Sequence, residues 1–418
     1  MTLTERHIIK HNNPLFPILD ELCYKSKNLY NATLYRIRQE YFNSGIYLSY
    51  YSTQKEFQDT SQFDYTELPS KVSQQTMRLV DQNFRSFFRA SQKYKKNPKK
   101  FKGRPKIPGY LDSIDGRCIV IYSYQSISKR ELESNNRIKF SGVDNIYIPT
   151  KIKYNELCQV RIVPRGPHIV IEVVYEVPGV DLLPDNNRYA SIDLGVDNLV
   201  TLTTNIHKEI PFVYSGKAIK SWNNYYNKSV GHYKSIISTI NKGKRKGWSK
   251  RLSKITLKRE MKINDYFHKV SRDIVNYLVS KHINTLIVGN NKGWKQNANL
   301  GKIGNQNFVQ IPFSKLISLL EYKCRLSGIN FIVITEEYTS KCSFLDNESI
   351  GKNNDIHLGI RVYRGLYKTS TGILINADVN GSYNILKKCK PDAFSNIPRK
   401  SNGVLDVVVH PLIKSILI

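Results

Sequence analysis

Hydrophobic and polar positions change their spacing several times along the 418 residues of the chain, and each change predicts a different kind of element. Polar and apolar residues alternate over 4–11, which predicts a short strand that ends before Pro14. Apolar residues then recur at steps of three or four over 18–42, as in an amphipathic helix, and a second helical pattern covers 68–96. The first hundred residues therefore predict one strand followed by a helical region.

Short apolar runs replace these helical patterns over 112–180. The runs are rich in β-branched and aromatic residues, are separated by Gly, Pro and Asn, and read CIVIYSY, RIKFSG, QVRIVP and HIVIEVVYEV. Such residues favour strands, so this segment predicts an all-β region. The stretch VDLLPDNN at 180–187 is typical of a linker into the second half.

Strands and helices alternate in the second half of the chain. The predicted elements are, in order, an apolar strand that contains Asp193, a strand at 210–216, a charged helical hairpin over 217–281, a strand at 285–290, a helix at 312–328, a buried strand at 329–335 and a helix that contains Asp378. This order is typical of an RNase H-like α/β sheet with helices on its faces. The segment from Pro391 to Ile418 is apolar enough to add a further strand or helix.

The net charge narrows the class of partner. Lys and Arg number 64 against 34 Asp and Glu, a formal charge of +30, and a compact chain with this excess repels itself unless it meets a polyanion. Nucleic acid is therefore the leading partner. The chain contains neither an apolar run of the ~18 residues that span a bilayer nor a signal-peptide pattern, which predicts a protein inside the cell without a membrane partner.

Two basic blocks indicate where nucleic acid would bind. Ten Lys or Arg and no acid lie between Arg85 and Lys106, interleaved with aromatic residues, and ten lie between Lys242 and Lys262 against Glu260 alone. Basic residues of this kind contact the phosphate backbone and provide affinity without sequence discrimination. A solvated helix face is the alternative interpretation of such blocks.

Two aspartates are candidates for chemistry. Asp193 lies inside an otherwise apolar strand, where an unpaired carboxylate is costly, unless it is a turn or cap residue instead. Asp378 lies at the start of a helix, where an ordinary acid is also favoured. Together two such carboxylates would bind Mg²⁺ for phosphodiester hydrolysis, and a third is expected from Glu336 or Glu337, of which Glu336 shares a face with Ile332 and Ile334.

The chain resembles the TnpB proteins of insertion sequences, RNA-guided DNA nucleases related to type V CRISPR effectors. The resemblance covers nearly the whole chain and rests on SKNLYNAT (26–33), KNPKKFKGRPKIPGY (96–110), SIDLGVDNLVTL (191–202), LIVGNNKGWKQ (286–296), NQNFVQIPFSKLISLLEYKC (305–324), EEYTSKCSFLD (336–346), RVYRGLY (361–367) and NADVNGSYNILKK (376–388). It implies a guide RNA transcribed from the transposon end, target double-stranded DNA with a short adjacent motif, and cleavage by a RuvC-like domain.

The resemblance also implies a multidomain α+β and α/β fold. An oligonucleotide-binding-like β-barrel, the wedge domain, would contain 1–15 and 112–185 and be interrupted by a helical recognition lobe over 16–111. A RuvC-like nuclease domain would follow over 186–418, with a helical insertion at about 217–281 and a degenerate zinc-ribbon region at about 338–371. A monomer in the prokaryotic cytoplasm, nucleoid-associated in use, is expected.

Two departures from the family pattern affect the expected site. The glutamate that usually ends the second RuvC strand is replaced by Gly289 and Asn290, so Glu336 is the favoured third ligand and Glu337 the alternate. Two Mg²⁺ ions, with Mn²⁺ as a substitute, would bind Asp193, Glu336 and Asp378. Only Cys342 remains of the usual four-cysteine zinc ribbon, so no zinc is predicted.

Two other functions compete with cleavage: a nuclease-inactive, RNA-guided DNA-binding repressor, and a transposase that catalyses strand transfer. Retention of Asp193, Asp378 and an acid at 336 or 337 favours cleavage over the repressor. The residues expected to contact nucleic acid are basic and are Lys27, Lys95, Lys96, Lys99, Lys100, Lys102, Arg104, Lys244, Arg245, Lys246, Lys250, Arg251, Lys295, Arg361 and Arg364. For the last two, a solvated turn is an equal alternative.

Overall fold

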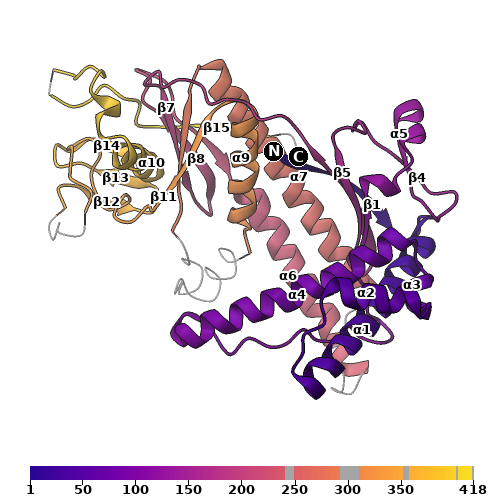
Figure 1. Ribbon diagram of the computed structural model, residues 1–418. Helices are drawn as coiled ribbons and strands as arrows, with labels where there is room; N and C mark the ends of the chain where they lie inside the picture. Colours follow the sequence, from indigo (N-terminus) through magenta and orange to yellow (C-terminus); the bar gives the residue numbers. More distant parts are fainter. Residues whose placement is uncertain (241–248, 292–309, 352–356, 402, 417–418) are drawn as a thin grey trace. The chain divides into compact units, whose positions relative to one another are not determined.

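A computed structural model describes residues 1–240, 249–291, 310–351, 357–401 and 403–416. The chain forms two compact units, Met1–Pro178 and Gly179–Ile418, each with its own mixture of helices and strands (Figure 1). Within the described ranges, no helix is both long enough and apolar enough to cross a membrane.

A four-stranded antiparallel sheet forms the β part of the first unit. Its order is β1 (Thr2–Lys10), β6 (His168–Glu176), β5 (Leu157–Pro164) and β2 (Val120–Ser123). β3 (Arg137–Lys139) and β4 (Tyr147–Pro149) form a separate ribbon, preceded by the short helix α5 (Lys129–Asn135). Because β1 pairs with β6, the two β segments that flank the helical region join in one sheet.

Four helices of the first unit lie between β1 and β2 in the sequence. They are α1 (Phe16–Ser44), α2 (Tyr50–Asp59), α3 (Phe63–Thr66) and α4 (Ser70–Lys96). One hydrophobic core contains Leu19 and Leu22 of α1 together with Val160 and Ile171 of the sheet. The apolar face that periodicity predicts for α1 therefore packs partly on the sheet rather than only on other helices.

A six-stranded sheet organises the second unit. Its order is β11 (Asn330–Ile334), β10 (Thr285–Gly289), β7 (Tyr189–Leu194), β8 (Asn198–Thr204), β9 (Phe212–Ser215) and β15 (Leu412–Lys414). β8 runs antiparallel to β7 and β9, whereas β10 and β11 run parallel to β7. This is the RNase H-like arrangement that the alternation of strands and helices predicts.

Residues of β7 alternate between two hydrophobic cores. Ala190, Ile192 and Leu194 pack with α7 (Lys250–Ser280) and α9 (Phe313–Leu326) on one face of the sheet. Tyr189 packs on the other face with α10 (Ala377–Cys389), and Ser191 bonds Ser382 there. The period of two places Asp193 on the α10 face.

Two sequence predictions need correction, and a third is confirmed. The strand predicted around Asp193 is two strands, because the chain turns back after β7 at Gly195, where an added Cβ would meet the Asn198 carbonyl oxygen at 2.5 Å. β11 is an edge strand and only partly buried, not a buried strand. The apolar C-terminal segment supplies β15, which pairs with β9 in parallel.

The helical hairpin predicted over 217–281 consists of α6 (Lys217–Ile240) and α7. A three-stranded sheet of β12 (Ile360–Tyr363), β13 (Leu366–Lys368) and β14 (Leu374–Asn376) precedes α10 directly. β14 leads into α10 without a loop, so this small sheet is fixed beside the helix that contains Asp378.

Candidate active site

Asp193 lies where small residues let a helix approach the sheet closely. It is the second-last residue of β7. A Cβ atom added to Gly381 of α10 would lie 3.0 Å from the Asp193 Oδ2 atom. A hydrogen-bond network of Ser191, Thr203 and Ser382 lies one pleat away, with oxygen to oxygen distances of 2.9 to 3.2 Å. The glycine and the serine therefore bring the start of α10 against Asp193.

Asp378 lies in the first turn of α10. The Asn376 side chain caps this helix and accepts hydrogen bonds from the backbone N–H groups of Asp378 and Val379. Asn198, at the start of β8, donates from Nδ2 to the Asp378 Oδ2 atom at 2.7 Å. Two asparagines thus set the position of this carboxylate, and neither is distinguished from other turn asparagines by its sequence pattern.

Glu336 occupies the space beside Gly289. Gly289 ends β10 opposite Ile334 of β11, and a Cβ added to it would lie 2.9 Å from Glu336 Oε2 and 3.2 Å from Glu336 Cβ. Asn291 accepts a hydrogen bond from the Glu336 backbone N–H at 3.0 Å and donates to Oε1 at 3.4 Å. The end of β10, which lacks an acid of its own, therefore holds the acid of the neighbouring strand.

The two adjacent glutamates have different surroundings. Glu336 is only partly accessible to solvent, and its Oε2 atom is buried without a hydrogen-bond partner. Glu337 is exposed, as period-two alternation predicts for the residue on the opposite side. The structure therefore brings Glu336, and not Glu337, together with Asp193.

Burial and the two other carboxylates act on the ionisation of Asp193. Burial raises the pKa of Asp193 well above its ordinary value, and the charges of Glu336 and then Asp378 raise it further. Burial raises the pKa of Glu336 to about 7, and the Lys388 ammonium opposes this rise. Like charges and partial desolvation both disfavour ionisation, so this cluster favours protons or cations.

The carboxylates are close, but they do not converge on one point. In the part of the chain that the structure describes, the ligand atoms of Asp193, Glu336 and Asp378 do not all lie within 4.8 Å of one another.

Two arginines of the β12–β13 hairpin extend towards this site. A guanidinium nitrogen of Arg361 lies 3.8 Å from Asp378 Oδ1, and one of Arg364 lies 3.1 Å from Asp197 Oδ2. Asp197 also pairs with Lys220 of α6, and the hydrogen bond from Lys220, followed by the charge of Arg364, lowers the pKa of Asp197. Each arginine therefore faces a carboxylate, and its contact with the scissile strand stays a prediction beside the alternative of a solvated turn.

A second group of potential ligands lies in the region where the family has its zinc ribbon. Cys342, Glu348 and His357 place their ligand atoms within 4.8 Å of one another. His357 Nδ1 lies 2.6 Å from Glu348 Oε1, and the Glu348 Oε2 atom accepts a hydrogen bond from the Ser343 N–H at 2.7 Å. These direct contacts satisfy the buried carboxylate within the protein.

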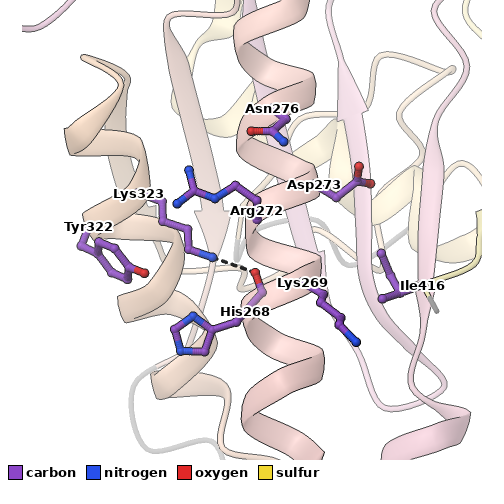
Figure 2. Close-up of a pocket in the computed structure, with 8 residues that line it drawn as sticks. All are labelled: His268, Lys269, Arg272, Asp273, Asn276, Tyr322, Lys323 and Ile416. Carbon is purple, nitrogen blue, oxygen red and sulfur yellow. Dashed lines mark hydrogen bonds between the residues drawn. The ribbon is translucent and has the colours of Figure 1, made fainter. Parts of the chain in front are cut away.

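A basic hollow of about 620 Å³ lies elsewhere in the second unit, between α7, α9 and Ile416 (Figure 2). The Lys323 ammonium donates to the His268 carbonyl oxygen and to Ser271 Oγ, both at 2.7 Å. Burial, followed by the charge of Arg272, lowers the pKa of Lys323 to about 8. Its one lining acid, Asp273, is paired with Lys414, so this hollow does not offer the paired carboxylates of a magnesium site.

The predicted nucleic-acid contacts have different outcomes. Lys27 is buried, with its ammonium donating to the Ser113 carbonyl oxygen at 2.7 Å and lying over the Tyr24 ring, so its prediction as a nucleic-acid contact is wrong. The exposed residues are Lys95, Lys96, Lys99, Lys100, Lys102, Arg104, Lys250 and Arg251. Lys244, Arg245, Lys246 and Lys295 lie outside the described residues.

Comparisons with known proteins give two family models and one relative. Residues 172–295 match the OrfB_IS605 family model, described as a probable transposase, and 313–385 match the model of the Cas12f1-like TNB domain. A TnpB-like protein, ORF457 of Acidianus two-tailed virus, is 21% identical over 93% of this chain and 87% of its own length.

Solved structures give more distant similarities. A Cas12f1–sgRNA–target DNA complex is 15% identical with a TM-score of 0.34, over 92% of this chain and 98% of that chain. The mini-RNA-guided endonuclease CRISPR-Cas_phi3 is 11% identical with a TM-score of 0.42, over 93% and 92% of the two chains.

An RNase H-like sheet with carboxylates at the ends of adjacent strands and on the following helix defines a protein with a RuvC-like domain. Both family models match parts of this domain, and the matched residues include Asp193, Glu336 and Asp378. Two family models and one relative thus relate this chain to TnpB-like and Cas12f1-like proteins.

The raised pKa of Glu336 predicts a pH-dependent stability. Because the folded value of about 7 exceeds the ordinary value of 4.5, the folded protein without divalent ions loses stability as the pH rises from about 4.5 to about 7. The shift corresponds to at most about 3 kcal/mol. Thermal unfolding in chelator should show Glu336→Gln gaining stability over the unsubstituted protein across this window, while the exposed control Glu337→Gln follows the unsubstituted protein. Parallel curves for all three proteins would contradict the prediction.

Hydrogen bonds within the protein already satisfy Glu348 in the group of Cys342, Glu348 and His357, so we expect the protein to fold without zinc. Because His357 contacts Glu348 directly, purified protein should carry substoichiometric zinc by mass spectrometry, and dialysis against a zinc chelator should leave its unfolding temperature unchanged. Stoichiometric zinc that is lost in Cys342→Ser would show that the prediction is wrong.

Proposed function

We propose that this protein is a guide-RNA-dependent endonuclease of an insertion sequence that hydrolyses a phosphodiester of target DNA at Asp193, Glu336 and Asp378. The approach of Glu336 to Gly289 carries the proposal, because it supplies an acid where the family's usual acid is replaced by glycine. The network of Asn291 around Glu336 supports a fixed position for that acid.

The side chains of the site fit divalent cations. Three carboxylates offer the hard oxygen ligands that Mg²⁺ and Mn²⁺ prefer, and Glu336 Oε2 is a buried acceptor that no hydrogen bond satisfies. Asp193, Glu336 and Asp378 would hold the ions. When bound, such ions lower the pKa of an attacking water and stabilise the leaving oxygen.

The protein's own groups would orient the substrate around these carboxylates. Asn198 fixes the rotamer of Asp378, so its second oxygen remains directed to Arg361. Arg361 and Arg364 each present a guanidinium that can pair with phosphate oxygens in place of the carboxylates they face. The hairpin would thereby position the scissile strand beside the acids.

The remaining family features extend this proposal. Residues 1–15 and 112–185 would form the wedge domain and 16–111 the recognition lobe, an assignment supported by the pairing of β1 with β6 across the helical segment. The exposed cations at the end of α4 would contact the backbone of the guide RNA or target DNA. Pairing with the guide would read the target, and the protein would read only the short adjacent motif.

Single substitutions at the two neighbouring glutamates test the proposal. With guide RNA, Mg²⁺ and target DNA, Asp193→Ala and Glu336→Ala should each reduce the cleavage rate about a thousandfold or more, since metal ions contribute several kcal/mol to the transition state. RNA binding should be retained. Glu337→Ala is the matched control and should cut normally.

Three results would contradict this assignment in different ways. Cutting that survives Asp193→Ala would refute the mechanism, and loss of cutting in Glu337→Ala but not in Glu336→Ala would move the third ligand. Guide-dependent DNA binding by the unsubstituted protein without any cutting would favour the repressor.

Gly289→Ala tests whether the glycine makes room for the acid. Its Cβ would also meet Ile385 Cδ1 at 2.5 Å, so overpacking of about 1–3 kcal/mol and displacement of Glu336 are expected. Cleavage should fall at least about tenfold, with a lower unfolding temperature. Gly231→Ala in α6, where a Cβ meets nothing within 4 Å, should change neither property unfavourably. Normal cutting by Gly289→Ala would contradict the proposed role of this space.

A further inference from the structure

Most of α6 lacks an apolar partner within its own unit. The buried residues of this 24-residue helix are Ile219 and Asn223 in its first two turns, and none of 224–240 is buried. Ile240 is 73% exposed and Tyr225 67%. A helix in a globular protein usually buries one apolar stripe, so this length of α6 presents a surface that suits another molecule.

A groove of about 880 Å³ lies along this part of α6 and the facing part of α7. Its aromatic residues all come from α6 and are Trp222, Tyr225, Tyr226 and Tyr233. Its cations on α7 are Arg251, Lys254, Lys258, Arg259 and Lys262. No Asp or Glu is among the described residues that line the groove.

Rings and cations meet across the groove. The Arg259 guanidinium lies 4.9 Å from the Tyr226 ring centre, the Arg251 guanidinium 5.4 Å from that of Tyr233, and the Lys262 ammonium 5.5 Å from that of Trp222. A row of rings with cations beside them offers stacking surfaces for bases and positive charge for phosphates in one place.

The groove begins beside the candidate active site. Lys220, one residue before its lining starts, pairs with Asp197, and Asp197 also pairs with Arg364 of the β12–β13 hairpin. The rise of an α-helix places Tyr233 about 20 Å along α6 from Lys220, the length of several nucleotides. A strand held at the carboxylates therefore has a continuous basic and aromatic path along α6.

We propose that the groove between α6 and α7 binds the single-stranded DNA that flanks the scissile phosphodiester. The inference rests on the proposed function, which brings DNA to the carboxylates. A single strand is the favoured occupant because unpaired bases can stack on the rings, whereas a duplex presents mainly its phosphates to a protein surface.

Binding to a fluorescein-labelled oligothymidylate, measured by anisotropy in an Asp193→Ala background, tests this groove without requiring cleavage. Tyr225→Ala/Tyr233→Ala should weaken binding at least about tenfold, because stacking contributes roughly 1–3 kcal/mol per base, and the Phe pair at the same positions should restore it. Lys254→Gln/Lys258→Gln should reduce the salt slope by about 1.4, at about 0.7 for each cation on a single strand.

Matched probes and variants distinguish the alternatives. Lys234→Gln/Ile236→Ala, on α6 but outside the groove lining, should bind as the parent does. The proposal would be overturned if the tyrosine variant lost affinity equally for the single strand and for its duplex, or if it lost no affinity. It would also be overturned if the parent did not bind the single strand. A loss confined to oligouridylate would overturn it in favour of an RNA surface. If the unsubstituted protein proves unable to cut, a groove-dependent loss of binding still supports the groove while the proposed nuclease function fails.

Discussion

Burial of carboxylates at one edge of a sheet is the constraint on which the candidate site depends. Burial raises the pKa of Asp193 well above its ordinary value, and the charges of Glu336 and Asp378 raise it further. The fold opposes the cost of this burial by packing α10 on β7 through Gly381, through the Ser191–Ser382 network and through the apolar core behind them. Burial of an isolated carboxylate is unfavourable, so these buried carboxylates favour a bound positive charge before any ligand arrives.

The same preference for positive charge explains why cationic side chains lie beside the carboxylates. Arg361 approaches Asp378, and Arg364 and Lys220 share Asp197, so the same cations that relieve the acids stand ready to accept phosphate oxygens. The exchange needs no movement of the sheet. The Arg364 side chain is 77% exposed, and those of Arg361 and Lys220 are 42% and 30% exposed, so solvent and substrate can reach each of them. The same cationic side chains can therefore pair with the protein's carboxylates and with the phosphates of the substrate.

Sequence reasoning predicted the parts of this site that follow from periodicity. The spacing of β7 predicts Asp193 on a buried face, and the parity of Ile332, Ile334 and Glu336 predicts the favoured glutamate. The position of Asp378 at the start of a predicted helix makes it a candidate, although an ordinary acid is also favoured there. Contacts between distant segments could not be predicted, since the Asn198 and Asn291 hydrogen bonds depend on how turns meet after folding. The same limit applies to Lys27, whose burial comes from the packing of α1. A lysine in a sequence motif gives no information on whether the core will cover its side chain.

Gly289 and Glu336 share one volume, and this relation decides how the site can be built. Parallel neighbouring strands place equivalent positions about 4.8 Å apart, and the chain beyond Ile334 returns Glu336 to the end of β10. A side chain at 289 and the glutamate at 336 would compete for the same space, whereas the absence of both acids would leave Asp193 and Asp378 with an incomplete set. The glycine is therefore not a lost ligand considered alone. Because Gly289 has no side chain, Glu336 from the chain after β11 can occupy the space beside it. The glycine and the glutamate therefore depend on each other.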